Sequence, residues 1–160
     1  MTIAKGERLP DSVLMQMTAN GPAPVQVRDL TAGKTVVLFA LPGAFTPTCS
    51  AKHLPGFRDR AAEFKAKGVD QIVCVSVNDA FVMGAWGRDQ KVGDSVLMLA
   101  DGNGDFTNAI GLTLDGRGFG MGRRSQRYSM LVKDGVVAEL NVEEGGEYKV
   151  SSAEYMLGQV

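Results

Sequence analysis

A cysteine that follows a proline-rich loop is the residue of this sequence best placed to act as a nucleophile. Residues 42–49 leave a short apolar run and enter a stretch with helical spacing, so Cys49 is expected in the first turn of a helix. Unpaired backbone N–H groups and the positive end of the helix dipole favour a thiolate there. Only the thiolate of a cysteine is a good nucleophile. The alternative is that Cys49 is a small buried hydrophobe.

The loop before this cysteine carries residue types suited to holding a small oxygen-containing substrate. The hydroxyl of Thr46 can both donate and accept, which would orient a peroxide oxygen beside the sulfur. Pro42 and Pro47 fix φ and lack N–H donors, so they stiffen the loop and shield the thiolate. Cleavage of an O–O bond also places negative charge on the leaving oxygen. A cation is therefore required, and the three arginines in residues 123–127 are the candidates.

Two further residues near this loop have open roles. Cys74 lies in a core strand, where a packed thiol is the simpler interpretation. Alternatively, Cys74 resolves the oxidised Cys49 as a disulfide, which requires Cα atoms within about 7 Å. His53 is the only histidine and lies one helical turn after Cys49. It either pairs with the thiolate as a general base, packs beside the site or faces solvent.

The strands that must position these residues are predicted from short apolar runs and turn signals. Residues 35–41, 71–77 and 95–100 are typical of strands buried in a parallel sheet. Alternation at 13–17, with 25–27 after a turn, predicts an N-terminal hairpin. A second hairpin is predicted from residues 127–133 and 136–142 around an Asp-Gly turn. Residues 111–122 carry many glycines and are expected to form a long irregular loop.

Helices are expected between these strands. The first begins near Thr48, is kinked or delayed by Pro55 and ends at Gly68. Others are predicted over 79–91, 105–110 and 151–157. Because strands alternate with helices and a hairpin follows, the order predicts an α/β protein. Its mixed central sheet would be flanked by helices, on a plan close to that of thioredoxin.

Composition excludes several classes of partner. The length of 160 residues fits one domain, residues 1–160. The net charge of −1 gives no global attraction to nucleic acid or an anionic membrane. The longest apolar run, 36–42, is too short to span a bilayer, and no signal segment is apparent. Two cysteines do not make a disulfide scaffold, which favours the cytosol or another reducing compartment. No pair of His, Cys or Asp positions has metal-site spacing.

The residues around Cys49 resemble a known family. The pattern Pro-x-x-x-Thr-x-x-Cys at Pro42, Thr46 and Cys49 is similar to the signature of the peroxiredoxins, and residues 42–50 resemble their type-II (atypical, fifth-class) branch. Similar strings at 53–57, 74–82, 99–102 and 127–132 extend the resemblance over nearly the whole chain. It implies a thioredoxin fold without metal, haem or flavin. It also implies that the cysteine reduces hydrogen peroxide and alkyl hydroperoxides and becomes a sulfenic acid.

The resemblance also implies which residues act. The matching catalytic set is Pro42, Thr46, Cys49 and Arg127, because the family's arginine precedes an aromatic residue as Arg127 does here. The backbone N–H of Cys49 would help to hold the substrate. Arg124 is the second choice, as a bridge that orients Arg127.

Reductant and assembly are implied by the same resemblance. Residues 146–154 resemble plant and bacterial members, which often accept electrons from glutathione and glutaredoxin, and the resolving cysteine of animal members is absent here. A one-cysteine cycle is therefore expected, with a Cys49–Cys74 disulfide reduced by thioredoxin as the alternative. The branch forms small dimers with the active-site loop near the interface. Phe45 and Trp86 are apolar candidates for that contact, or core residues.

Two other classes compete with a peroxidase. A dithiol–disulfide oxidoreductase would need Cys-x-x-Cys, but Cys49 is followed by Ser50-Ala51-Lys52 and then His53, with no second cysteine. A redox-sensing or holdase-like binding protein would use the same fold without turnover.

Overall fold

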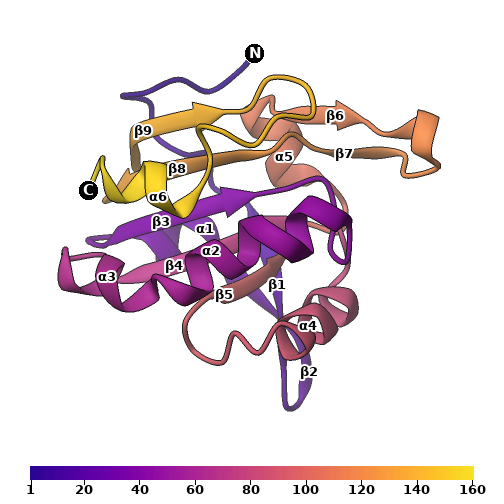
Figure 1. The fold of residues 1–160 in the computed structure, drawn as a ribbon, viewed down its shortest axis with the longest axis horizontal. Helices are drawn as coiled ribbons and strands as arrows, with labels where there is room; N and C mark the ends of the chain where they lie inside the picture. The colour runs from indigo at the N-terminus through magenta and orange to yellow at the C-terminus, as the bar shows by residue number, and fades with distance from the viewer.

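The protein is built on a seven-stranded mixed sheet with helices on both faces (Figure 1). The computed structural model describes residues 1–160, with strands in the order β2-β1-β5-β4-β3-β8-β9. The strands are β1 (Val13–Thr18), β2 (Gly21–Gln26), β3 (Thr35–Ala40), β4 (Gln71–Ser76), β5 (Leu97–Ala100), β8 (Tyr128–Lys133) and β9 (Val136–Val142). Strands β3, β4 and β5 are parallel and the other pairs antiparallel. The predicted mixed sheet and both predicted hairpins are confirmed.

Helices cover the two faces of the sheet unequally. One face carries α2 (Leu54–Asp59), α3 (Ala61–Ala66), α4 (Ala80–Asp89) and α6 (Ala153–Leu157), whose buried side chains share one apolar cluster. The other face carries α1 (Val27–Thr31) and α5 (Asp105–Ile110), which contribute to a second cluster. Helix α1 is not among the predicted helices, because five residues are too few to show a helical period.

Strand β3 is apolar throughout because both of its faces are buried. Val37 and Phe39 belong to the cluster under α2, whereas Val36 and Leu38 belong to the cluster on the opposite face. A strand covered by helices on both faces has no solvent side, so its pattern does not alternate. In the parallel register Phe39 is opposite Cys74. The carboxyl ends of β3 and β4 therefore meet at one edge of the sheet, where the loop after β3 begins.

The helix after this loop is interrupted as its proline predicts. Its first turn, Cys49–His53, is π-helical, with the N–H of Leu54 donating to the carbonyl of Cys49. Pro55 has no N–H for the residue four positions earlier, which favours a widened turn at this point. The regular helix then breaks again at Arg60. Gly68, at φ +92°, ends α3, and the N–H of Val69 donates to the carbonyl of Phe64.

The glycine-rich stretch 111–122 is not the irregular loop that was predicted. It contains β6 (Thr113–Asp115), which pairs antiparallel with β7 (Arg123–Ser125) as a two-stranded arm, and a 3-10 turn at Arg117–Phe119 near its end. The arm extends away from the main sheet (Figure 1). The strands are only three residues long, so the sequence offers no periodic signal for them.

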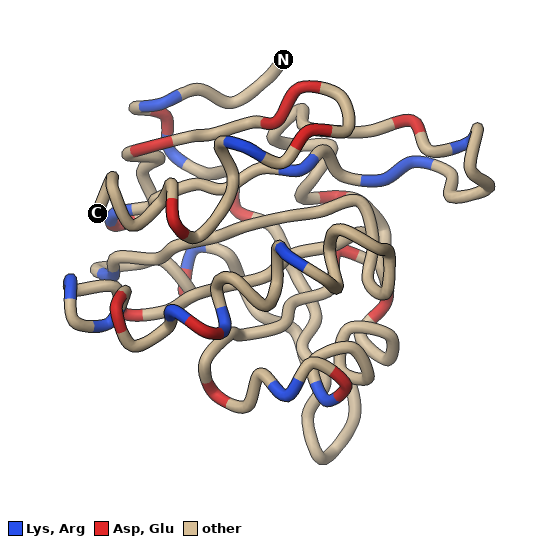
Figure 2. The backbone as a smooth tube through the Cα atoms, viewed as in Figure 1, with Lys and Arg blue, Asp and Glu red and all other residues tan.

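Charged residues of both signs are mixed along the chain, apart from the three arginines of residues 123–127. Lys and Arg positions are interspersed with Asp and Glu positions along most of the backbone (Figure 2). No helix has both the length and the apolar character needed to cross a membrane.

Candidate active site

The arginine predicted to assist catalysis reaches the sulfur of the predicted nucleophile. Cys49 begins the π-helical turn and is fully buried, while Arg127 precedes β8 and is half-buried. Arg127 Nη2 donates to Cys49 Sγ at 3.0 Å. A fixed guanidinium at this distance stabilises negative charge on the sulfur, because the hydrogen bond is charge-assisted. The structure therefore brings together two residues that are 78 positions apart in the chain.

The second nitrogen of the same guanidinium is held by the only histidine. Arg127 Nη1 lies 2.9 Å from His53 Nδ1, and His53 Nε2 lies 2.9 Å from the carbonyl oxygen of Ser151. A carbonyl only accepts, so Nε2 carries the proton and donates, and Nδ1 accepts from Arg127. Both ring nitrogens of His53 are hydrogen-bonded to groups other than the sulfur, so His53 is a positioning residue for Arg127. Its role was open from the sequence, where the four-residue spacing from Cys49 was the signal that the two residues share a helix face.

The surroundings of His53 keep its ring neutral. It is fully buried and packs beside Phe39 and Phe57, with ring centroids 4.9 Å and 5.7 Å away. Burial, followed by the charge of Arg127, lowers the pKa of His53 to about 3, against a smaller opposing effect of the Ser151 carbonyl. A neutral ring is required here, because a protonated Nδ1 has no lone pair to accept from Arg127.

This buried histidine predicts an acid-sensitive fold. The unfolded chain binds a proton below the ordinary pKa of 6.5, whereas the folded protein does not until about 3. The unfolded state therefore gains protons first, and stability falls as pH is lowered through this window. From pH 7 to pH 5 we expect a loss of about 2 kcal/mol in the free energy of unfolding. Urea denaturation at both pH values measures it.

The matched variant for that measurement is His53→Asn, which removes the titrating ring. Its free energy of unfolding should change less than that of the wild type between the two pH values. Equal pH dependence in both proteins would show that His53 is not the source of the acid sensitivity.

The loop that carries Thr46 is fixed at several points. The hydroxyl of Thr46 donates to the carbonyl of Gly43 at 2.7 Å, so its oxygen remains free to accept a hydrogen bond from a substrate. Asn78, which follows β4, accepts from the N–H of Ala44 at 3.0 Å. Phe45 adopts φ +66°, an uncommon conformation for a non-glycine residue. These contacts hold the loop before Cys49 in one conformation beside the sulfur.

The expected bridge from Arg124 to Arg127 is not present. Arg124 Nη1 donates instead to the carbonyl of Pro42 at 3.4 Å, and its Nε donates to the carbonyl of Met121 at 2.8 Å. Gly43 leaves room for this contact, because a Cβ there would lie 2.9 Å from Arg124 Nη1. Arg124 therefore supports the loop before the cysteine, and His53 holds Arg127.

Cys74 is placed in the core beneath the site. It is fully buried on β4, and no disulfide joins it to Cys49. Burial raises the pKa of the Cys74 thiol well above its usual range, and the charge of Cys49 raises it further, against a smaller effect of Arg127. At neutral pH it remains a protonated thiol, which is a poor nucleophile.

The two aromatic candidates for a subunit contact differ in their exposure to solvent. Trp86 is fully buried, and its indole N–H donates to the hydroxyl of Ser50 at 3.0 Å, so it is a core residue that fastens α4 to the π-helical turn. Phe45 is 52% exposed, with its ring centroid 6.4 Å from that of Trp86. Only Phe45 is available to a partner.

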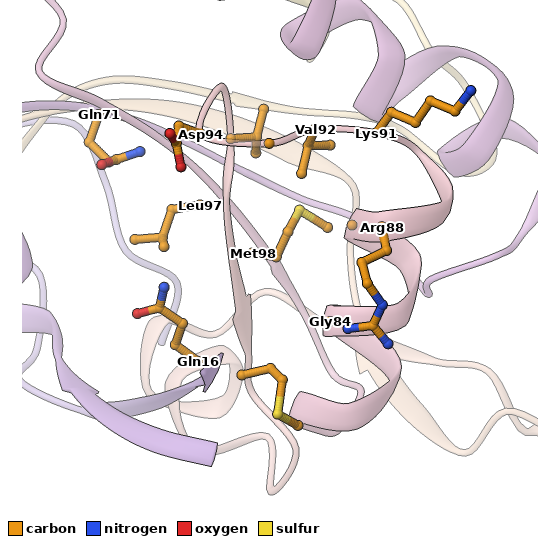
Figure 3. Close-up of a pocket in the computed structure, with 13 residues that line it drawn as sticks. Gln16, Gln71, Gly84, Arg88, Lys91, Val92, Asp94, Leu97 and Met98 are labelled. Carbon is orange, nitrogen blue, oxygen red and sulfur yellow. The ribbon is translucent and has the colours of Figure 1, made fainter. Parts of the chain in front are cut away.

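A large surface hollow lies elsewhere. It measures about 420 Å³ and is lined from β1, β5, α4 and the loop between α4 and β5, including Gln16, Arg88, Lys91 and Met98 (Figure 3). None of the residues of the predicted catalytic set lines it. No group of three or more His, Cys, Asp or Glu side chains that could hold a metal ion is present.

Comparisons with known proteins agree with this geometry. The Redoxin family model matches residues 4–157. Peroxiredoxin-2E, chloroplastic, of Arabidopsis thaliana is 53% identical over 160 residues, which cover 98% of this chain and 68% of that protein. Peroxiredoxin-2B of the same plant is 49% identical over 97% of this chain and 96% of its own. The crystal structure of reduced Prx3 in complex with hydrogen peroxide from Vibrio vulnificus has a TM-score of 0.96 and 54% identity, covering 99% of each chain.

The chain therefore belongs to the Redoxin family, and its fold is the thioredoxin-like fold of the peroxiredoxins. Within that family its relatives are type-2 peroxiredoxins, and it is a thiol-dependent peroxidase with Cys49 as the peroxidatic cysteine.

Proposed function

We propose that the protein reduces hydrogen peroxide and alkyl hydroperoxides through Cys49 alone, with an external small thiol as the reductant. The observation that carries the proposal is the hydrogen bond of 3.0 Å from Arg127 to Cys49 Sγ, made by an arginine that His53 holds in place. No bound cofactor takes part in the proposed cycle.

In the first step the Cys49 thiolate attacks one peroxide oxygen. The S–O bond forms as the O–O bond breaks, and the leaving oxygen takes a proton and departs as water or an alcohol. Cys49 is oxidised to a sulfenic acid. Arg127 would stabilise the charge that moves from sulfur to the leaving oxygen. Thr46 would accept from the peroxide hydroxyl, because its own hydrogen is directed to Gly43.

In the second step a thiol such as glutathione attacks the sulfenic sulfur, and water leaves. A second thiol, on glutaredoxin or another glutathione, then attacks the glutathione sulfur of this mixed disulfide. A new disulfide forms between the two external thiols, and Cys49 leaves as its thiol. Two observations favour an external thiol over Cys74: Cys74 is fully buried, and its raised pKa keeps it protonated. Cys49 is also fully buried, so its turn must open before a reductant larger than a peroxide reaches the sulfur.

Intact-protein mass after one equivalent of hydrogen peroxide tests this cycle, with Cys74→Ser as the matched variant. Both proteins should gain one oxygen, and glutathione should convert that product into a mixed disulfide. The opposite result is a wild type that loses two hydrogens and does not react with glutathione. That outcome would assign Cys74 as the resolving cysteine and thioredoxin as the donor.

The proposal extends to assembly and location. A homodimer is proposed through the surface that carries Phe45, because this half-exposed aromatic side chain lies within the active-site loop. A cytosolic or equivalent reducing compartment is proposed, since there both cysteines remain thiols and a thiol reductant is abundant.

A further inference from the structure

A buried carboxylate lies at the far end of the contacts that hold Arg127. Glu143, directly after β9, is only 6% exposed and has no salt bridge to any cation. Its Oε2 accepts instead from the backbone N–H groups of Lys149, Val150 and Ser151 at 2.8, 3.0 and 2.9 Å, and from the hydroxyl of Ser151 at 2.5 Å. A buried charge is tolerated only where such donors replace water.

These hydrogen bonds keep the carboxylate ionised. Burial alone would raise the pKa of Glu143, but the hydroxyl and N–H of Ser151, with the N–H groups of Val150 and Lys149, outweigh it and hold the pKa below its usual value. One side chain thus fixes three consecutive backbone units. We call residues 147–151 the clamped loop.

The clamped loop is in direct contact with the histidine of the site. The carbonyl of Ser151, whose N–H and hydroxyl are bound to Glu143, accepts from His53 Nε2 at 2.9 Å. Tyr148 of the same loop meets the ring of His53 edge-on, with centroids 5.4 Å apart, and its hydroxyl donates to the carbonyl of Lys52 at 3.3 Å. The loop therefore determines both the position and the tautomer of His53.

We propose that Glu143 is a positioning residue for peroxide reduction, acting through the clamped loop and His53 to hold Arg127 on the sulfur of Cys49. The inference rests on the catalytic role proposed for Arg127. If the Ser151 carbonyl moves, His53 Nε2 loses its acceptor, and the tautomer protonated on Nε2 loses one of the two contacts that favour it. An imidazole protonated on Nδ1 cannot accept from Arg127 Nη1, so the guanidinium loses one of its two fixed partners.

The test compares Glu143→Ala and Glu143→Gln with the wild type and with Glu144→Ala. Glu144 is the exposed neighbour and forms no salt bridge, so it is the matched control. Two properties are measured: the rate constant for hydrogen peroxide, and the pH midpoint for alkylation of Cys49 by iodoacetamide. Glu143→Ala should lower the rate about 5- to 20-fold and move the midpoint upward, because hydrogen bonds to charged groups are involved. Glu143→Gln, which keeps one acceptor oxygen, should recover part of both.

A purely structural role predicts something different. Thermal stability would fall in Glu143→Ala while the alkylation midpoint and the rate constant stayed at their wild-type values, and that result overturns the proposal. If Glu143→Ala does not fold, Glu143→Gln and Ser151→Ala give the test. Each weakens the hydrogen bonds between residue 143 and the clamped loop without removing all of them. Both should then shift the midpoint in the same direction.

A double-variant cycle identifies the route. In a His53→Ala background, Glu143→Ala should cause little further change in rate or midpoint, because the connection to Arg127 is already lost. Full additivity of the two substitutions would contradict a route through His53. Alkylation does not involve peroxide, so its midpoint reports the Glu143 contacts independently of the proposed peroxidase activity. An unchanged midpoint contradicts this inference, whereas a shifted midpoint with an unchanged peroxide rate contradicts the catalytic role proposed for Arg127.

Discussion

Replacing Cys49 with serine is expected to abolish peroxide reduction completely. A serine hydroxyl is protonated at neutral pH and forms no sulfenic acid, so the variant has no group beside Arg127 that can take the peroxide oxygen. The sulfur is fully buried and makes one hydrogen bond, to Arg127, so the fold should survive the exchange. Consumption of hydrogen peroxide in the presence of excess glutathione, followed over time, measures the effect.

The control for this substitution is Cys74→Ser, at the other thiol of the chain. It should retain most of the wild-type rate, because Cys74 is a buried core residue and the guanidinium of Arg127 donates to Cys49 rather than to Cys74. Residual turnover in Cys49→Ser, or loss of turnover in Cys74→Ser with the fold intact, would reverse the roles of the two cysteines.

Removing the charge at Arg127 is expected to have the second-largest effect. Arg127→Ala leaves Cys49 Sγ and His53 Nδ1 without their shared donor. A hydrogen bond to a charged group contributes about 1.5–3 kcal/mol, which corresponds to a rate about 10- to 100-fold lower. Arg127→Lys should recover only part of the loss, because an ammonium does not reproduce the planar fork that reaches two acceptors at once. Stopped-flow measurement of the first oxidation step gives the rate directly.

The comparison variant is Arg28→Ala, which removes an exposed arginine from α1 on the opposite face of the sheet. It should react at the wild-type rate. If Arg127→Ala also reacts at that rate, then Arg127 has no catalytic role, and Arg124 beside Pro42 becomes the residue to test.

Much of the site was predictable because its residues are close together in the sequence or precede a strand with a clear pattern. Pro42, Thr46 and Cys49 belong to one loop whose spacing indicates a helix N-terminus. The residues alone limited the cation to the three arginines of 123–127, and the resemblance to the peroxiredoxins selected Arg127, which directly precedes β8. The sheet was equally predictable, because β3, β4 and β8 are buried runs with distinct boundaries.

The supporting residues were not predictable, because their contacts are long-range. Ser151 and His53 are 98 residues apart, and Arg124 and Pro42 are 82 apart, so no local spacing relates them. Nothing in the sequence distinguishes Glu143 from other acidic residues that follow a strand. Its role is visible only once the clamped loop is seen to fold back on its carboxylate. The β6–β7 arm was missed because its strands are too short for a periodic pattern.

The most direct test of the account is to trap the sulfenic acid with dimedone during reaction with one equivalent of hydrogen peroxide, and to locate the adduct by peptide mass. We expect the adduct on the peptide that contains Cys49, forming rapidly in the wild type and much more slowly in Arg127→Ala. An adduct on the peptide that contains Cys74, or equal rates in the two proteins, would contradict the central claim that Arg127 activates Cys49 as the peroxidatic thiol.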